Sequence, residues 1–171
     1  VNWLGARRSE AAFVRHARKG CVALFVSSIA AHGFTPDEAT IAALDADLDD
    51  RALERLEAAF AEHTPSDAYR LSKFAMNRMC RKRAAAWGKR GARIVSLSPG
   101  LIATPMGALE FQGSPGKMAL YEKSPLEREG TMIEVAAAAE FLISNAASFI
   151  SGTDLLVDGG LAGALQFPET P

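Results

Sequence analysis

Three short apolar runs along the chain predict the strands of a sheet. They lie at residues 21–27 (CVALFVS), 92–98 (ARIVSLS) and 153–158 (TDLLVD). The first run is apolar without alternation, which is typical of a strand covered on both faces.

Apolar residues recur at helical spacing around these runs. The pattern predicts helices at 3–19, with Gly20 as a stop signal, at 67–88 and at 132–144. Strands that alternate with helices need crossover connections, so we expect an α/β fold with a parallel sheet and three α/β/α layers.

Residues 34–64 interrupt the alternation and predict an inserted helical hairpin. Thr35 is the expected N-cap, Pro36 the first helical residue and Glu38 the partner in a capping box. Two apolar stripes follow, formed by Ile41, Leu44 and Leu48 and by Leu53, Leu56 and Phe60. Nine acidic and two basic residues between positions 36 and 62 predict an anionic outer face.

Residues 104–130 form a second interruption, rich in glycine and proline. The segment carries the apolar residues Met106, Leu109, Phe111, Met118, Leu120 and Tyr121. A long apolar loop in a compact domain is often a lid over a ligand, and a plain surface loop is the alternative.

Composition narrows the function classes. The chain has 171 residues, 49% hydrophobic and 23% charged, with a net charge of -1, as in an ordinary soluble globular protein. The charge argues against a dedicated nucleic-acid-binding protein. No apolar run reaches the length of a membrane span, and the first residues do not resemble a signal peptide. We expect a cytoplasmic protein.

Cysteine and histidine usage gives no sign of a metal site or a disulfide. Cys21 and Cys80 are expected to be reduced thiols. His16, His32 and His63 lack the spacing of metal ligands, so no metal is expected.

Tyr69 and Lys73 lie four residues apart in the predicted helix at 67–88 and therefore project from the same side. An ammonium a few ångströms from a phenol favours the phenolate. Such a tyrosine could exchange a proton with a carbonyl or an alcohol. Taken alone, the pair is also what two unrelated side chains on one helix face would look like.

The ends of the three predicted strands bring further groups to the same edge of the sheet. The first strand ends in VSSIA, the second in SPGLIATPM and the third in DGG. Open α/β sheets bind ligands at the carboxyl edge of their strands. Adjacent strand residues point to opposite faces, so only one of Ser27 and Ser28 can face a given pocket.

These motifs together resemble the short-chain dehydrogenase/reductase family over residues 2 to about 163. YRLSK matches the family's Tyr-x-x-x-Lys motif, VSSIA its strand-end serine and PGLIATPM its Pro-Gly-x-x-x-Thr turn. The closing helix, the last strand and the opening VNWLG are also similar to the family's pattern. The resemblance implies a doubly wound Rossmann fold and an oxidoreductase that uses NAD or NADP.

The resemblance also implies roles for particular residues. Asn2 would hold a water that relays protons to Lys73, Ser28 would bind the substrate oxygen and Tyr69 would be the acid/base. Lys73 would bind the nicotinamide ribose and assist Tyr69. The cofactor-binding set is Tyr69, Lys73, Pro99, Gly100, Ile102 and Thr104. The substrate lid is Met106, Leu109, Phe111, Met118 and Tyr121, whose apolar character implies a hydrophobic alcohol or ketone such as a steroid.

Two departures from the family pattern qualify this interpretation. No glycine-rich strand-to-helix turn for a dinucleotide precedes the first strand; DGGLAGA at 158–164 has similar spacing but follows the last strand, so we interpret it as a decoy. We therefore interpret residues 1–171 as the C-terminal part of a Rossmann domain, inactive by itself, with a naturally short product as the alternative. The rival function is a non-catalytic remnant that serves only as an interaction or folding module.

The second departure is that 41 positions separate Ser28 from Tyr69, far more than in typical family members. The hairpin at 34–64 accounts for the excess. A subgroup resembling bacterial 3α-hydroxysteroid dehydrogenase/carbonyl reductase carries a helical insertion here, which favours NAD. The insertion should obstruct the family's four-helix tetramer interface and favour a homodimer through another face.

Overall fold

The computed structural model describes residues 2–60, 64–113 and 115–168. In chain order its elements are α1 (Asn2–Phe13), β1 (Val22–Val26), η1 (Ile29–Ala31), α2 (Glu38–Asp45), α3 (Ala52–Ala59), α4 (Pro65–Gly88), β2 (Arg93–Pro99), α5 (Pro105–Gly113), α6 (Pro115–Tyr121), α7 (Met132–Ile143), η2 (Asn145–Ala147), β3 (Asp154–Val157) and α8 (Leu161–Gln166).

The strands form one parallel sheet in the order β1-β2-β3. Val22 of β1 is paired with Arg93 of β2, and Ser96 of β2 is paired with Asp154 of β3. The α/β class and the parallel sheet expected from the sequence are therefore confirmed. Because all strands run the same way, their carboxyl ends meet at one edge.

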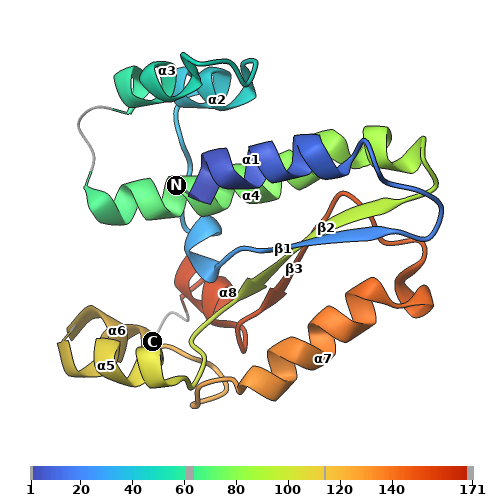
Figure 1. Cartoon of the computed structure of the whole chain (residues 1–171). Coiled ribbons are helices and arrows are strands. Elements are labelled where there is room, and N and C mark those ends of the chain that lie inside the picture. Colours follow the sequence, from blue (N-terminus) through green and yellow to red (C-terminus); the bar gives the residue numbers. More distant parts are fainter. Residues whose placement is uncertain (1, 61–63, 114, 169–171) are drawn as a thin grey trace.

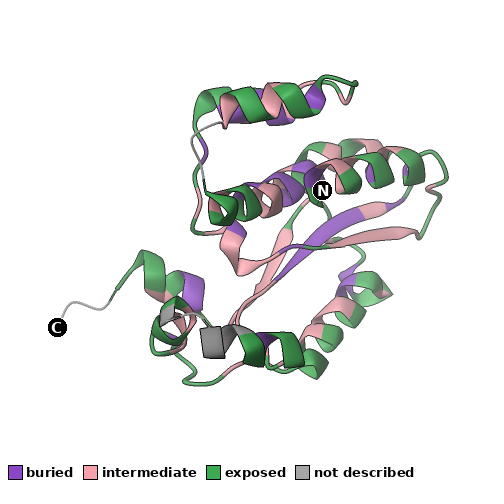
Figure 2. Ribbon diagram, turned by 60° about the vertical axis from the view of Figure 1, so that its left-hand side comes forward, coloured by how far each residue is buried: buried purple, intermediate pink, exposed green. Residues whose placement is uncertain are grey.

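Helices α1 and α4 cover one face of the sheet and α7 covers the other (Figure 1). Side chains of β2 alternate between these two layers, as expected for a strand. Ile94 packs with Cys80 and Trp87 on the α4 side, whereas Val95 and Leu97 pack with Leu142 of α7. Figure 2 shows β2 as the most buried strand, so the core is centred on it.

Helices α2 and α3 pack on α1 and α4 through a separate apolar cluster. Trp3, Leu44, Leu71 and Ala75 are buried in it. The hairpin begins later than predicted, because α2 is capped by Asp37, whose carboxylate accepts a 2.7 Å hydrogen bond from the Thr40 N–H. A carboxylate is a stronger cap for a helix N-terminus than the hydroxyl that we assigned to Thr35.

Helix α1 ends at Phe13, well before the predicted end near residue 19. Residues after it turn so that the Gly20 N–H can donate to Gly91 O at 3.0 Å, which brings the chain into β1. Apolar spacing continues through this turn because Val14 and Ala17 pack in the core, which misled the helix prediction.

The segment 104–130 is not a plain loop, because it contains α5 and α6. Pro105 and Pro115 are the first residues of these helices. Proline is well tolerated at that position, since the first helical N–H has no partner within the helix.

Other observations limit the chemistry available. Both cysteines are free thiols, and burial raises the pKa of Cys80 to about 12, so that side chain is not a nucleophile. No cluster of three or more potential metal ligands occurs in the described part of the chain; His63 falls outside it. No helix among the described residues has both the length and the hydropathy to cross a membrane.

Candidate active site at the carboxyl edge of the sheet

The two serines that follow β1 have different partners. Ser27 is buried; its N–H donates to Leu97 O at 2.7 Å and its hydroxyl donates to Lys73 O at 3.1 Å. Ser28 is half-buried and caps η1, with its Oγ accepting a 3.2 Å hydrogen bond from the Ala30 N–H. Ser27 therefore links α4 to the sheet by a hydrogen bond. The Ser28 hydroxyl acts as an acceptor in the cap, so its hydrogen can still be donated to a ligand oxygen.

Lys73 joins Tyr69 to the end of β1. Its Nζ donates to Val26 O at 3.1 Å and lies 5.7 Å from the centroid of the Tyr69 ring. Partial burial lowers the pKa of Lys73 below its usual value, because desolvation disfavours the ammonium. Tyr69 as a whole residue is 44% exposed, so a ligand at this edge could reach it.

Asn2 lies at the start of α1, where its side chain is exposed. α1 packs along α4, the helix that carries Tyr69 and Lys73 (Figure 1). The role of Asn2 in holding a water stays a prediction.

Gly100 follows β2 where the ends of β2 and β3 approach closely. Its N–H donates to Val157 O at 2.9 Å. A Cβ at this position would lie 2.6 Å from Asp158 Cα and 2.7 Å from Asp158 Cβ. The glycine is therefore needed for the close contact with the backbone at Asp158.

The replacement Gly100→Ala should destabilise the fold by about 1–3 kcal/mol, because the added methyl meets backbone that cannot rotate away. Thermal unfolding followed by circular dichroism measures this loss. Gly5→Ala is the matched control: no atom lies within 4 Å of the added Cβ. In helix α1 that change should stabilise by about 0.5–1 kcal/mol. Equal stability of the wild type and Gly100→Ala would contradict the close approach.

Residues 101–104 connect Gly100 to α5, and we call this short segment the backbone shelf. Ile102 is bridged to Gly130, and the Ala103 N–H donates to Gly130 O at 2.8 Å. Thr104 Oγ1 accepts a 2.9 Å hydrogen bond from the Gly107 N–H and can still donate its own hydrogen. The Thr104 hydroxyl could therefore donate to an amide or phosphate oxygen of a ligand.

The predicted decoy at 158–164 provides no anion site. Asp158 accepts hydrogen bonds from the N–H groups of Gly160 (2.9 Å) and Ala162 (2.7 Å) at the start of α8. A carboxylate already occupies this helix terminus and would repel a pyrophosphate.

The proposed lid residues lie on α5 and α6, close to the shelf in sequence. Met106 is 71% exposed, Leu109 69% and Met118 48%. The Tyr121 hydroxyl donates to Glu127 O at 3.1 Å, which ties the end of α6 to the following loop. The side chain of Phe111 lies outside the described residues. The exposed members give the segment an apolar surface.

Two pairs of polar residues escaped the sequence analysis. His32 Nε2 lies 2.8 Å from Asp154 Oδ2, and the Asp154 side chain is 3% exposed. This pair links the turn after Ser28 to β3 across the sheet. On α4, the Asn77 amide donates to Ser98 Oγ at 3.4 Å in the buried layer above β2. An acidic residue within the apolar run TDLLVD was the available signal for the first pair, because buried carboxylates need a partner.

The arrangement gives a half-buried hydroxyl, an exposed tyrosine and an ammonium near the carboxyl edge of the sheet. Such groups can bind an alcohol or carbonyl oxygen and exchange a proton with it. Within the described residues near this edge, no activated thiol or metal-ligand cluster offers other chemistry.

The chain is similar to several known proteins. A family model described as enoyl-(acyl carrier protein) reductase matches residues 52–162. The 3-alpha-hydroxysteroid dehydrogenase/carbonyl reductase of Comamonas testosteroni is 33% identical over 170 residues, which cover 97% of this chain and 66% of that protein. The short-chain dehydrogenase/reductase bsc3 of Alternaria brassicicola is 44% identical over 95 residues, which cover 54% of this chain and 35% of the relative.

Solved structures show the same likeness. The 3-alpha-hydroxysteroid dehydrogenase from Pseudomonas sp. B-0831, solved with NADH, superposes with a TM-score of 0.77 at 28% identity over 100% of this chain and 67% of that protein. This chain thus spans between about a third and two thirds of the length of these relatives.

Proposed function

Because this chain belongs to the short-chain dehydrogenase/reductase family, we propose that the whole protein is a nicotinamide-dependent oxidoreductase that interconverts a secondary alcohol and a ketone. The observation that carries the proposal is Lys73, whose ammonium bonds to the end of β1 and lies beside the ring of Tyr69. The similarity to two hydroxysteroid dehydrogenases, one of which was solved with NADH, supports the proposal.

A bound reduced nicotinamide would supply the hydride to the carbonyl carbon. Tyr69 donates its hydroxyl proton to the carbonyl oxygen, and the Lys73 ammonium stabilises the phenolate that results. Ser28 donates a hydrogen bond to the same oxygen and fixes its position. In the oxidation direction the phenolate takes the proton back, so the same groups serve both reactions.

Residues Pro99, Gly100, Ile102 and Thr104 are proposed to hold the nicotinamide end of the coenzyme. The backbone shelf and the Thr104 hydroxyl support this assignment. NAD is favoured over NADP, because the hydroxysteroid dehydrogenase relative from Pseudomonas was solved with NADH. Two free thiols are compatible with the reducing conditions of the cytoplasm, where we propose that the protein acts.

A hydrophobic ketone or secondary alcohol, with a steroid-like ring system as the first candidate, is the proposed substrate. The exposed apolar side chains of Met106, Leu109 and Met118 support this class. Burial of such side chains against a ring system would contribute about 25 cal/mol for each Å² removed from water. Asn2 is proposed to hold the water that relays protons to Lys73.

Replacing each of the two serines by alanine tests the proposed site. Ser28→Ala should lower kcat for the coenzyme-dependent reduction of a hydrophobic ketone by about 10²-fold, because the oxygen loses a positioned donor. Ser27→Ala should cost about 1 kcal/mol of folding stability, because one hydrogen bond to α4 is lost, and should reduce kcat much less. Absorbance at the reduced-nicotinamide band follows the reaction. The opposite ranking of the two kcat values would contradict the assignment of Ser28.

We further propose that the protein is a homodimer through the outer face of α7. Met132, Ile133, Phe141 and Ile143 on α7 are all at least 43% exposed, and the nearby Phe149 is fully exposed. An apolar surface of this kind is typical of a protein–protein contact. Sedimentation equilibrium should give a dimer that Ile133→Glu dissociates; a tetramer would contradict the proposal.

A further inference from the structure

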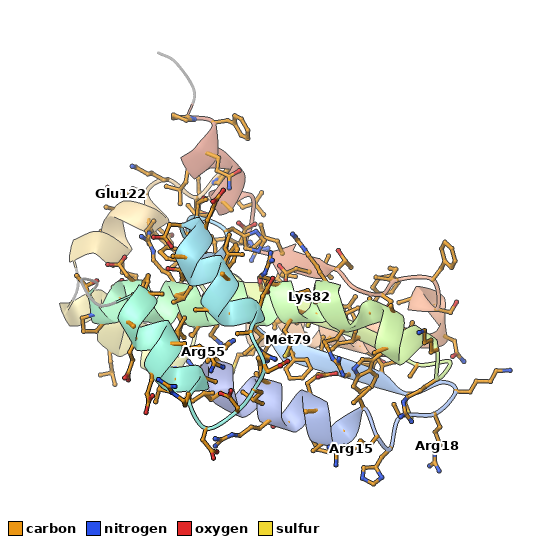
Figure 3. All side chains as sticks on the ribbon, turned by 90° about the horizontal axis from the view of Figure 1, so that it is seen from above. Arg15, Arg18, Arg55, Met79, Lys82 and Glu122 are labelled. Atoms are coloured by element: carbon orange, nitrogen blue, oxygen red, sulfur yellow. The ribbon has the colours of Figure 1, made fainter. Side chains whose placement is uncertain are left out.

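A cavity of about 300 Å³ lies between the inserted hairpin and the helices α1 and α4, and its lining carries more positive than negative charge. The cations are Arg7 of α1 and Arg78, Lys82 and Arg83 of α4. The described lining residues include two carboxylates, Glu10 of α1 and Asp45 of α2. Figure 3 shows Met79 and Lys82 on the side of α4 that faces the hairpin. The proposed active-site residues do not line this cavity.

Both carboxylates are fully engaged by part of this cationic set. Asp45 accepts from Arg78 at 2.6 and 2.8 Å and from Lys82 at 2.8 Å. The hydrogen bonds from Arg78 hold the pKa of Asp45 well below its usual range, so this carboxylate stays charged. Glu10 is buried and accepts from Arg83 and from the Trp87 indole, each at 2.8 Å.

Cationic donors remain after these contacts. A guanidinium carries five N–H donors and an ammonium three. Arg83 uses its Nε for Glu10, and the Lys82 side chain, which contacts Asp45 through one donor, is 47% exposed. Arg7 donates to the carbonyl oxygens of Leu44 and Ala46 at the end of α2, which are not anions. The lining therefore carries four cations against two carboxylates, a net excess of two positive charges, and among the four cations only Arg7 contacts no carboxylate of the lining.

The rest of the lining is apolar and partly aromatic. Trp3, Leu44, Leu48, Ala75 and Met79 contribute to it, and the Arg7 guanidinium lies 5.7 Å from the centroid of the Trp3 ring. A guanidinium is planar and weakly hydrated, so Arg7 could stack on a flat apolar group as well as lie near the indole. The volume lies at the lower end of the range for small-molecule sites.

We propose that this cavity binds a small amphipathic organic anion, a carboxylate or sulfonate on a flat apolar body. The body packs on Trp3, Leu48 and Met79, and the anionic group is bound by Lys82 and Arg83. Because the ligand touches both the hairpin and α4, binding stabilises the docking of the hairpin on the sheet domain. The site is separate from the proposed reaction and does not depend on it.

The test uses 8-anilinonaphthalene-1-sulfonate, a fluorescent biaryl sulfonate of the right size and charge. Titration of the purified protein should give saturable binding at one strong site per chain. Lys82→Gln should weaken it about two- to fivefold, the effect expected for one partly exposed charge contact. Ala11→Phe, which puts a ring into the cavity without changing its charge, should abolish strong binding.

Arg81→Gln is the matched control, because Arg81 is an exposed cation next to Lys82 on α4 but does not line the cavity. The Arg81→Gln variant should bind the probe like the wild type. In the wild-type protein, probe binding should also slow hydrogen exchange of the backbone amides in α2. Circular dichroism verifies that each variant is folded, and Lys82→Gln decides the outcome if Ala11→Phe does not fold. Absence of saturable binding, or binding that Lys82→Gln leaves unchanged, overturns the proposal.

Discussion

Tyr69→Phe should lower the turnover of a ketone by about 10²- to 10⁴-fold while the affinity for the coenzyme changes little. The ring stays, so the contact with Lys73 and the packing of α4 are kept, and only the hydroxyl that exchanges the proton is lost. Single-turnover oxidation of the reduced coenzyme measures the chemical step. Fluorescence titration of the coenzyme measures the affinity separately.

Arg70→Gln is the control for Tyr69→Phe. Arg70 is the next residue on the same helix, is exposed and lies 3.9 Å from Asp67, a weak surface contact. Its replacement should leave turnover near the wild-type rate. A Tyr69→Phe variant that turns over like Arg70→Gln would remove the tyrosine from the mechanism.

Lys73→Met should reduce turnover by a similar factor and, unlike Tyr69→Phe, should also weaken coenzyme binding. Methionine keeps most of the apolar stem but removes the ammonium that bonds to Val26 O and lies beside the Tyr69 ring. Both the stabilisation of the phenolate and the proposed contact with the ribose are then lost. The comparison of kcat with coenzyme affinity separates the two roles.

The double variant Tyr69→Phe/Lys73→Met provides the check on Lys73. Residues that act as one unit have non-additive effects, so the double variant should be about as slow as the slower single variant. Multiplicative losses would mean that Lys73 assists the reaction independently of Tyr69. Full coenzyme affinity in Lys73→Met would contradict its binding role.

The sheet and the long helix α4 could be predicted from the sequence because their signals are local. Three apolar runs correspond to β1, β2 and β3, and the period from Leu71 to Met79 follows the buried side of α4. The predicted ends of helices were less accurate where a single capping or first-turn residue determines where the helix begins. The carboxylate of Asp37 caps α2 in place of the predicted Thr35, and Pro105 begins a helix that had been interpreted as loop.

The sequence predicted which residue types form the candidate site, but it did not predict which side chains are hydrogen-bonded to each other. The alternation rule allowed either serine to face the pocket, and the hydrogen bond from Ser27 to the backbone of Lys73 supplies the distinction. The pair His32 and Asp154 joins positions 122 residues apart, which no local pattern reveals. The charged cavity beside the hairpin could not be predicted from the sequence either. Its cations lie on two helices, α1 and α4, that are far apart in the chain, and the inserted hairpin completes the lining.

A crystal structure of the whole protein with reduced coenzyme and an unreactive ketone analogue would test the central claim most directly. We expect both Tyr69 Oη and Ser28 Oγ within about 3 Å of the ketone oxygen, with Lys73 Nζ beside the ribose. A ketone oxygen bound elsewhere, with the phenol of Tyr69 directed into solvent, would contradict the account.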